Sequence, residues 1–371
     1  MRIPPFLRWA LSVPLLGSMA IGNSALEWTP LPALPDPEGF AGMYAGTTKR
    51  GIIAAGGHHF EKGVPWWNGG AKVWSDSIYT LESPSGPWTI AQAKMPRALG
   101  DGVGVGYRDG IICAGGGDAT QAYAEVFFLH WNGRQIEIRT LPSLPSPLLK
   151  MGGTVVEDVL YLVGGRDHPA STSALPAFFA LDLSRPENDR RWLSLPTWPG
   201  PARMMPVVAA GRDGLYVFGG IEITSDSQGK PKNVAPYLTD AYCYRPGIGK
   251  TGGQWKKLAD LPRPLAGAPS PAWLRDESTV MVFGGVDGAI EAITDRSSVR
   301  SLPADILAYN IASNEWTRAG RIPGSMFPRV NAPAVMWHGN YTIISGEHLP
   351  ARRSNAVTSV RARPPGRTKG D

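Results

Sequence analysis

The sequence predicts an all-β fold made of six repeated sheets, and two observations support this prediction. The first is composition: the 371 residues include 45 glycines and 35 prolines, and only 18% are charged. Such a composition favours short strands and tight turns over long helices. The second is a run of β-branched or aromatic residues that ends in a glycine pair and recurs along the chain, which indicates a repeat architecture.

The glycine pairs give the number of repeats. Five pairs are complete: Gly56-Gly57, Gly115-Gly116, Gly164-Gly165, Gly219-Gly220 and Gly284-Gly285. A sixth copy keeps the second glycine, Gly346, and has Ser345 in place of the first. Successive copies are about 50 to 65 residues apart, which is long enough for one four-stranded sheet per repeat.

A tryptophan and an apolar-proline turn follow most glycine pairs in a fixed order. In the first repeat the strand-like run 78–81 is followed by Trp88 and then by Met95-Pro96. The equivalent tryptophans of later repeats are Trp192, Trp255 and Trp316. The second repeat departs, with Ile138 at that position. The pattern resembles the kelch repeat and predicts a six-bladed kelch-type β-propeller over residues 26–362, with the tryptophans packed between neighbouring blades.

The last repeat lacks its outer strand. After Glu347 the chain supplies one more strand, at about Asn355 to Ala362, and no tryptophan or apolar-proline turn follows it. Those missing elements stand near the other end of the chain, in the run 26–32 around Trp28. The N-terminal strand should therefore complete the last blade, which closes the ring and leaves no free sheet edge.

Both ends of the chain are expected to lie outside the propeller. Residues 1–25 have a basic start, an apolar stretch and small residues at the end, which predicts a signal peptide and a periplasmic or secreted protein. An uncleaved membrane anchor is the alternative, although Pro14 interrupts a short apolar run. Residues 363–371 form a basic Pro/Gly-rich tail that we expect to be disordered. Because these ends carry most of the formal charge of +6, we expect no nucleic-acid partner and, after cleavage, no membrane partner.

Two cysteines, Cys113 and Cys243, could pair, but each lies in an apolar strand-like run, and two separate buried thiols are the simpler interpretation. Copper-radical oxidases share the kelch architecture, so a tyrosine–cysteine cofactor at Cys243 is a further alternative. Its neighbours Tyr242 and Tyr244 are adjacent in sequence, and adjacent side chains of a strand face opposite sides.

Histidines could in principle mark a metal site. His58 and His59 are adjacent, however, and with His168 they show no third ligand at a diagnostic spacing. The sequence therefore predicts no metal and no cofactor.

Candidate binding residues gather on one face of the predicted propeller. We denote the strands of a blade a to d from the axis outward, so that d–a links and b–c loops emerge on the same face. The d–a links carry five cations: Arg97, Lys150, Arg203, Arg263 and Arg329. The b–c loops carry His58, His59, Asp118, Arg166, Asp167, His168, Glu222, Asp287, Glu347 and Arg353. A ring of cations with a few carboxylates suits an anionic small molecule, whereas salt bridges between blades are the alternative use of such residues.

The last blade carries a more specific motif. The segment 345–357, with Glu347, a short Pro-containing loop and Arg353, resembles the active-site segment of the bacterial N-acetylneuraminate epimerases, or sialic acid mutarotases. Segments 39–42, 52–57 and 96–100 also resemble this family, but here they precede the Glu/Arg blade instead of following it. The sequence thus resembles the cyclically permuted mutarotases, since a closed propeller with adjacent termini tolerates such a change of order.

The resemblance implies an isomerase that converts the α anomer of N-acetylneuraminate, or of a related acidic sugar, to the β anomer without a cofactor. Glu347 matches the family's glutamate and is the expected proton shuttle. Arg353 matches the family's arginine, with Arg352 beside it as a second candidate, and is expected to clamp the sugar carboxylate. The expected substrate-binding residues are Arg97, Arg203, Lys150 and Arg352.

Two non-enzymatic functions fit the same fold. A lectin-like propeller that captures acidic glycans would keep the arginines and have no need of Glu347. A protein-interaction propeller would instead expose apolar side chains at its loop tips. Fold alone does not decide between these functions.

Overall fold

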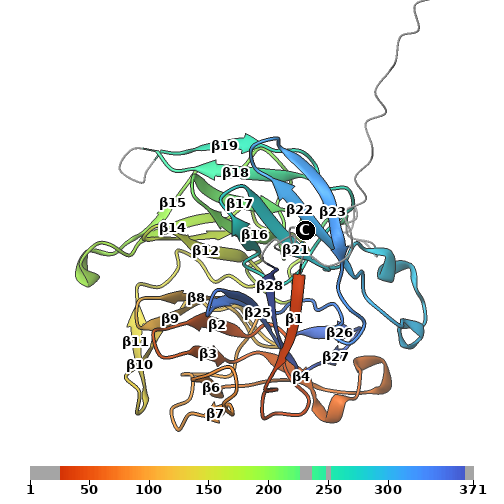
Figure 1. Cartoon of the computed structure of the whole chain (residues 1–371). Coiled ribbons are helices and arrows are strands. Elements are labelled where there is room, and N and C mark those ends of the chain that lie inside the picture. Colours follow the sequence, from red (N-terminus) through yellow and green to blue (C-terminus); the bar gives the residue numbers. More distant parts are fainter. Residues whose placement is uncertain (1–25, 226–235, 248–251, 364–371) are drawn as a thin grey trace, which may run out of the picture.

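Six four-stranded antiparallel sheets surround a central axis in the computed structural model, which describes residues 26–225, 236–247 and 252–363 (Figure 1). This arrangement confirms the predicted all-β, six-bladed propeller. Helical segments in these ranges are short 3₁₀ turns, and none has the length and apolar character needed to cross a bilayer. The predicted signal peptide (1–25) and nearly all of the predicted basic tail (363–371) lie outside the described residues.

The blades follow one another along the chain, each running from its inner to its outer strand. The first three are β2 (Tyr44–Thr47), β3 (Ile52–Ala55), β6 (Ile78–Leu81) and β7 (Thr89–Ile90); β8 (Val103–Tyr107), β9 (Gly110–Ala114), β10 (Val126–Trp131) and β11 (Ile136–Leu141); and β12 (Gly152–Val156), β13 (Val159–Val163), β14 (Phe178–Asp182) and β15 (Trp192–Ser194). The last three are β16 (Val207–Gly211), β17 (Gly214–Phe218), β18 (Ala241–Arg245) and β19 (Gln254–Lys257); β20 (Trp273–Asp276), β21 (Thr279–Phe283), β22 (Asp305–Asn310) and β23 (Glu315–Arg321); and β24 (Ala334–Trp337), β25 (Asn340–Ile344), β28 (Val357–Ala362) and β1 (Leu26–Leu31).

The N-terminal strand closes the ring, as predicted. Strand β1 pairs with β28 along its whole length, with Leu26 opposite Ala362 and Leu31 opposite Val357. In Figure 1 the red start of the described chain accordingly runs beside its dark blue end. The closure leaves the sixth blade with the same four strands as the others, so its inner strands and loops are held as firmly as theirs.

The repeated tryptophans lie between neighbouring blades. Each donates its indole N–H to a backbone carbonyl just beyond the outer strand of the preceding blade. The bonds are Trp88 to Pro32 (2.8 Å), Trp192 to Pro142 (2.8 Å), Trp255 to Pro196 (2.8 Å) and Trp316 to Ala259 (3.0 Å). A buried indole needs such a partner, and here the partner also fixes the distance between blades.

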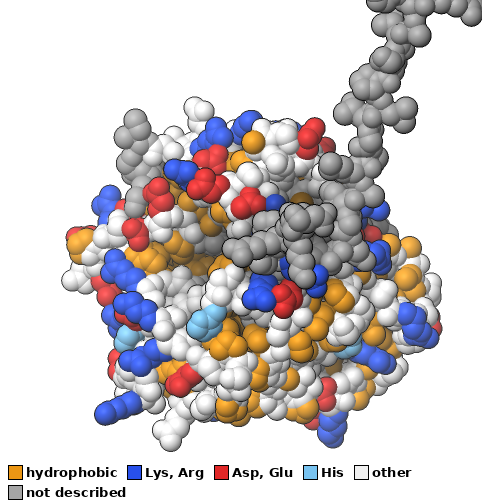
Figure 2. All heavy atoms as spheres, viewed as in Figure 1, with side chains coloured by type: hydrophobic (Ala, Val, Ile, Leu, Met, Phe, Trp, Pro, Cys, Tyr) orange, Lys and Arg blue, Asp and Glu red, His pale blue; other side chains and the backbone are white. Residues whose placement is uncertain are grey.

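The core consists of the apolar layers between blades. One such layer joins side chains of the second and third blades, including Ile112, Phe128, Leu160 and Leu181. On the face seen in Figure 2, basic and acidic side chains are mixed over the surface.

The two cysteines lie within these apolar layers, in separate blades. Both Cys113 and Cys243 are buried and unpaired, which confirms the prediction of two separate thiols. Burial raises the pKa of both thiols, that of Cys243 to about 12.

A closed circle of backbone hydrogen bonds surrounds the axis where the d–a links enter the inner strands. Its six members, one per blade, all have a left-handed backbone with φ between 52° and 67°, and we call them the inner ring: Gly42, Asp101, Lys150, Met205, Gly267 and Asn331. The N–H of each donates to the carbonyl of the member in the preceding blade, at 2.6 to 3.0 Å. All six line a cavity of about 70 Å³. This cavity marks the end of the propeller axis at which the d–a links of the six blades converge.

Candidate active site

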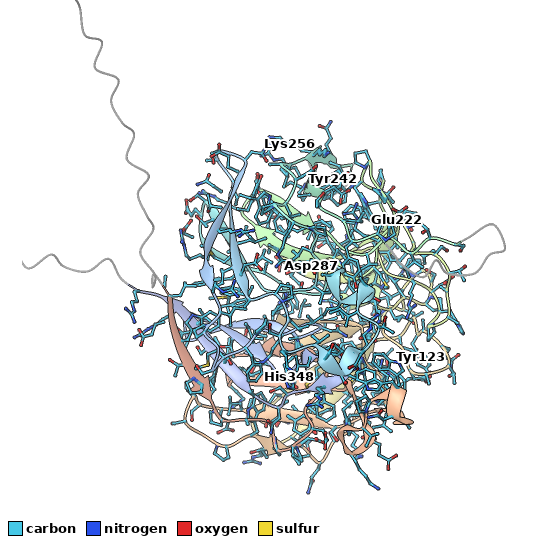
Figure 3. The ribbon with its side chains drawn as sticks, turned by 90° about the vertical axis from the view of Figure 1, so that its right-hand side faces the viewer. Tyr123, Glu222, Tyr242, Lys256, Asp287 and His348 are labelled. Carbon is cyan, nitrogen blue, oxygen red and sulfur yellow. The ribbon has the colours of Figure 1, made fainter. Side chains whose placement is uncertain are left out.

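A second set of residues surrounds the inner ring on the same face. The first residue after each glycine pair bridges to the d–a link, and we call these the loop-start residues: His58, Gly117, Arg166, Ile221, Val286 and Glu347. The mouth is the opening bounded by the inner ring and the loop-start residues. Figure 3 shows this side of the molecule, with Tyr123, Glu222, Asp287 and His348, each from a different b–c loop, spread around it.

Polar side chains occupy only part of the mouth. Four adjacent blades, the sixth, first, second and third, supply the inner-ring and loop-start side chains that are charged or polar: Asn331, Glu347, His58, Asp101, Lys150 and Arg166. The fourth and fifth blades supply only Met205, Ile221, Gly267 and Val286 at these positions. The mouth therefore has a charged sector and a smaller apolar sector, which suits a ligand with both an anionic group and an apolar group.

Glu347 and Arg353 form an ion pair in the sixth-blade part of the charged sector. They face each other across a small hairpin, β26 (Glu347–Leu349) and β27 (Arg352–Arg353), whose turn includes Ala351 with φ of 58°. Arg353 Nη1 lies 2.7 Å from Glu347 Oε2, and the side chains are 6% and 28% exposed. Burial raises the pKa of Glu347, against the opposing effect of Arg353. A carboxyl whose pKa is raised towards neutrality is suited to carry protons.

His58 links Arg353 to a second carboxylate. It begins β4 (His58–Phe60), and its Nε2 lies 3.2 Å from Asp101 Oδ1 while its Nδ1 lies 3.4 Å from Arg353 Nη2. Asn331 donates from Nδ2 to the same Asp101 oxygen at 2.6 Å. Burial, assisted by nearby cations, lowers the pKa of His58 to about 3 despite Asp101, so the imidazole is neutral.

Three further cations face this cluster. Lys72 lies on β5 (Lys72–Trp74), Lys150 belongs to the inner ring and Arg166 is a loop-start residue. Among the described residues none of the three side chains has a hydrogen-bond or ion-pair partner, and Arg166 Nε is buried without one. Burial lowers the pKa of Lys150, and it lowers that of Lys72 to about 8.

The charges of this sector do not balance. Within the described ranges, Lys72, Lys150, Arg166 and Arg353 face two carboxylates, Asp101 and Glu347. Burial raises the pKa of Asp101, but His58, Lys150 and Lys72 reverse the effect and hold it well below its usual range. Since His58 is neutral, it acts on Asp101 as a hydrogen-bond donor, and the two lysines supply the positive charge. The excess of cations means that an anion entering the mouth would meet unshared donors.

Comparison with known proteins gives the family. The model of the N-acetylneuraminate epimerase family matches residues 8–138 and 141–292, which is more than half of the chain. The chain belongs to the N-acetylneuraminate epimerase family. The match ends before the blade that carries Glu347 and Arg353, and a permuted blade order, which the sequence predicts, would end a collinear match in this way.

Curated relatives and a solved structure agree with this assignment. The N-acetylneuraminate epimerase of Haemophilus influenzae (strain 86-028NP) is 27% identical over 58% of this chain, and that of Salmonella typhi is 25% identical over 59%. The matches span 58% and 57% of the length of those relatives. A solved structure titled "Structure of YjhT" aligns with a TM-score of 0.63 over 89% of this chain and 95% of that one, at 15% identity, which supports the fold.

The ring of cations expected for this epimerase-family chain is not formed. Three of the link arginines instead bind a carboxylate at the start of a c strand: Arg97 with Glu125 (2.6 Å), Arg203 with Asp240 (2.6 Å) and Arg263 with Asp305 (2.9 Å). Arg329 is buried and donates to Thr358 Oγ1 at 2.9 Å. Of the five link cations only Lys150 is an inner-ring member. The other four stand two or more residues before the inner-ring position, in the part of the link that still passes between strands.

Two of the predicted substrate-binding residues, Arg97 and Arg203, have carboxylate partners in the structure. Arg203 is fully buried and donates to both oxygens of Asp240 and to the carbonyls of Pro201 and Gly219, so its guanidinium is not accessible to a ligand. Arg97 is bound to Glu125, and its guanidinium lies 4.3 Å from the ring of Tyr123. Arg352 lies on the exposed side of β27, next to Arg353 but facing away from Glu347. Lys150 alone among these four lines the axial cavity.

Sequence reasoning missed several members of the charged sector. Asp101 and Asn331 occupy the same repeat position as Lys150, so an alignment of the repeats on their d–a links would have found them. His58 is expected on the binding face and considered as a metal ligand, but its sequence position does not predict a contact with Arg353 or Asp101. Lys72 lies in the excursion between His58 and β6, which has no counterpart of similar sequence in the other repeats, so no repeat signal marks it.

Proposed function

We propose that this protein is an isomerase that interconverts the α and β anomers of N-acetylneuraminate or a related acidic sugar. The observation that carries the proposal is the Glu347–Arg353 ion pair, set beside three cations that have no hydrogen-bond or ion-pair partner among the described residues. The names of the curated relatives support the same substrate class. Glu347 has the raised pKa that a proton shuttle needs, and the cations supply the charge that a sugar carboxylate would offset.

The reaction requires two proton movements around one bond. The anomeric hydroxyl loses its proton, the bond between the anomeric carbon and the ring oxygen breaks, and the ring oxygen gains a proton. This gives the open-chain keto acid. After rotation about the bond beside the new carbonyl, the ring oxygen attacks the other carbonyl face, and the protons return. Atoms and electrons balance without an added reactant, and Glu347 is the group proposed to take and return the proton.

Arg353 has a different part in this proposal. A guanidinium does not give up its proton at neutral pH, so it serves as a planar donor for the sugar carboxylate or for charge that develops on the ring oxygen. Its side chain is held at three sides: by Glu347, by His58 and by the ring of Phe60, whose centre lies 4.8 Å from the guanidinium carbon. Lys150 and Arg166 are placed to share the carboxylate.

The apolar sector favours an acylated sugar over a simple sugar acid. Met205 and Gly267 of this sector line the axial cavity, opposite the charged sector. An N-acetylated sugar carries a methyl group some distance from its carboxylate, so both of its ends would find a matching surface.

Proton NMR of freshly released α-N-acetylneuraminate tests the proposed function. With catalytic amounts of the protein, the α resonances should convert to those of the β anomer many times faster than in buffer alone. The unpartnered cations also suit a lectin-like propeller for acidic glycans. Saturable binding of the sugar without any acceleration of the conversion would support that alternative and contradict the isomerase.

We also propose that the protein is exported and that residues 1–25 are its signal peptide, as their basic, apolar and small-residue order suggests. The mature chain would then begin close to β1, the strand that closes the propeller. Mass spectrometry of the protein recovered from the periplasm or the medium should find a new N-terminus near residue 26. A full-length chain confined to the cytoplasm would contradict export.

A further inference from the structure

We infer that His58, fixed by Asp101, is the positioning residue that sets the orientation of the Arg353 guanidinium in the mouth. This inference rests on the proposed function for its kinetic consequence and on geometry alone for the hydrogen-bond relay itself. The relay joins three blades: Asn331 lies on the link into the sixth, His58 in the first and Asp101 on the link into the second.

The hydrogen bonds fix which nitrogen of His58 carries the proton. A guanidinium has only donors, so the Nδ1 atom that lies 3.4 Å from Arg353 Nη2 must be the acceptor and must lack a proton. In the neutral ring the proton is then on Nε2, which donates to Asp101 Oδ1 at 3.2 Å. A proton on both nitrogens would place an N–H against the Arg353 cation, so the geometry itself requires the neutral ring.

The relay is rigid at its far end. The side chains of His58 and Asp101 are 3% and 6% exposed. Asp101 has a left-handed backbone with φ of 62°, and the circle of inner-ring hydrogen bonds holds it there. Its Oδ1 also accepts from Asn331, so the carboxylate that orients His58 is itself bonded from the link into the sixth blade. Second partners of this kind keep a functional side chain within the narrow geometry that catalysis needs.

The neutral imidazole between Asp101 and Arg353 preserves more of the positive charge of Arg353 than a direct contact between Asp101 and Arg353 would. If Asp101 touched Arg353, the guanidinium would be shared between two carboxylates, Asp101 and Glu347, and would attract an anion weakly. The neutral ring of His58 accepts from Arg353 without neutralising it. The guanidinium is thereby oriented from two sides, by Glu347 and by His58, while keeping net charge for the sugar.

Substitutions at His58 test its role as a hydrogen-bond acceptor separately from its role as a packed side chain. His58→Asn offers a side-chain oxygen near the place of Nδ1, whereas His58→Leu has the same branched arrangement of side-chain heavy atoms as asparagine and offers no acceptor. His59→Leu is the matched control, because His59 is the next residue of β4 and turns to the other side, where it meets the ring of Phe40 edge-on at 5.3 Å. The thermal midpoint of each full-length variant is measured alongside its kinetics.

The expected results follow from the role of Arg353. Misplacement of a positioned group by about an ångström can lower a rate about 100-fold, so His58→Leu should lose about that factor in kcat/KM. Most of the loss should lie in kcat, because Lys150 and Arg166 still bind the carboxylate in both states. His58→Asn should recover to within about 10-fold of the native protein, and His59→Leu should match it. Equal losses in the asparagine and leucine variants, or no loss in either, would overturn the inference.

Nitrogen NMR of the native protein tests the relay without reference to activity. With ¹⁵N-labelled histidine, His58 should show an unprotonated Nδ1 and a protonated Nε2 between about pH 5 and 8, because the charged groups that face it are Asp101, Lys72 and Arg353. A proton on Nδ1, or titration of the ring within this range, would overturn the relay even if the enzyme is active. A correct spectrum in a protein that accelerates no anomerisation would instead uphold the relay and overturn the proposed function.

Discussion

We predict that the Arg203–Asp240 pair stabilises the propeller and does not bind substrate, and one substitution separates these two roles. Arg203 is fully buried, and its Nη1 and Nη2 lie 2.6 and 2.7 Å from the two oxygens of Asp240, whose side chain is 15% exposed. Asp240→Asn keeps the shape of the side chain but removes the charge, and it turns an amide N–H toward a guanidinium N–H. Removing one partner of a buried ion pair costs about 3–5 kcal/mol of unfolding free energy.

Urea unfolding, followed by tryptophan fluorescence, measures this cost. The matched control is Asp76→Asn, which breaks an ion pair of similar length, 2.8 Å to Lys94, whose side chains are 35% and 63% exposed. Exposed pairs contribute about 1 kcal/mol or less, so the control should shift the midpoint little and Asp240→Asn should shift it strongly with an unchanged slope.

The anomerisation rate of the same variants tests whether Arg203 takes part in substrate binding. Well below its unfolding midpoint, Asp240→Asn should keep kcat/KM within about twofold of the native value, because neither side chain reaches the mouth. The reasoning would be refuted by a variant of nearly native stability that has lost most of its kcat/KM. Such a result would mean that Arg203 binds the sugar after all.

Three further predictions follow from other residues. Ala356→Asp should raise the unfolding free energy by about 1–2 kcal/mol. Position 356 accepts the same backbone bond as Asp240, so a carboxylate there would meet the buried guanidinium of Arg329, which is bonded to Thr358 and has no carboxylate partner among the described residues. An unchanged or lower midpoint would show that the repeats differ here. Native activity should fall as pH rises through about 8, where Lys72 loses its proton. The Lys72→Met variant should be slow at all pH values and should not show this decrease. A decrease near pH 8 that persists in the variant would mean that another group causes it. Both cysteine thiols should resist a thiol reagent until the protein is unfolded, and rapid labelling of the native protein would contradict their burial.

The sequence predicts the fold well because its strongest signal, the paired glycines, lies at positions whose backbone conformation disfavours most other residues. The paired glycines have left-handed conformations that other residues adopt at a cost, and an added Cβ at Gly56 would lie 2.6 Å from the Leu99 carbonyl oxygen. In the sixth copy Ser345 adopts the same conformation, with φ of 55°, and its hydroxyl accepts from the Phe40 N–H. Constraints of this kind recur in every blade, so the repeat count and the closure could be read from the chain.

The site could be predicted only in part. The alternating direction of the strands places the d–a links on the correct face. It does not predict which residue of a link lies nearest the axis. Lys150 stands at the inner ring, whereas Arg203 stands two residues before the equivalent Met205 and turns between strands instead. Asp101 gives only a weak signal by itself, because aspartate tolerates a left-handed backbone in many turns and only its alignment with Lys150 across the repeats marks it as an inner-ring position.

The most direct test of the proposed chemistry is the exchange of α- and β-N-acetylneuraminate by Glu347→Gln, with binding of the sugar measured on the same sample. The amide keeps the shape of the side chain and can still lie beside Arg353, but it cannot take a proton. The account predicts that the sugar still binds, within about tenfold of the native affinity, while the acceleration is lost. A variant that binds the sugar and interconverts the anomers at the native rate would contradict the role of Glu347 as the proton shuttle.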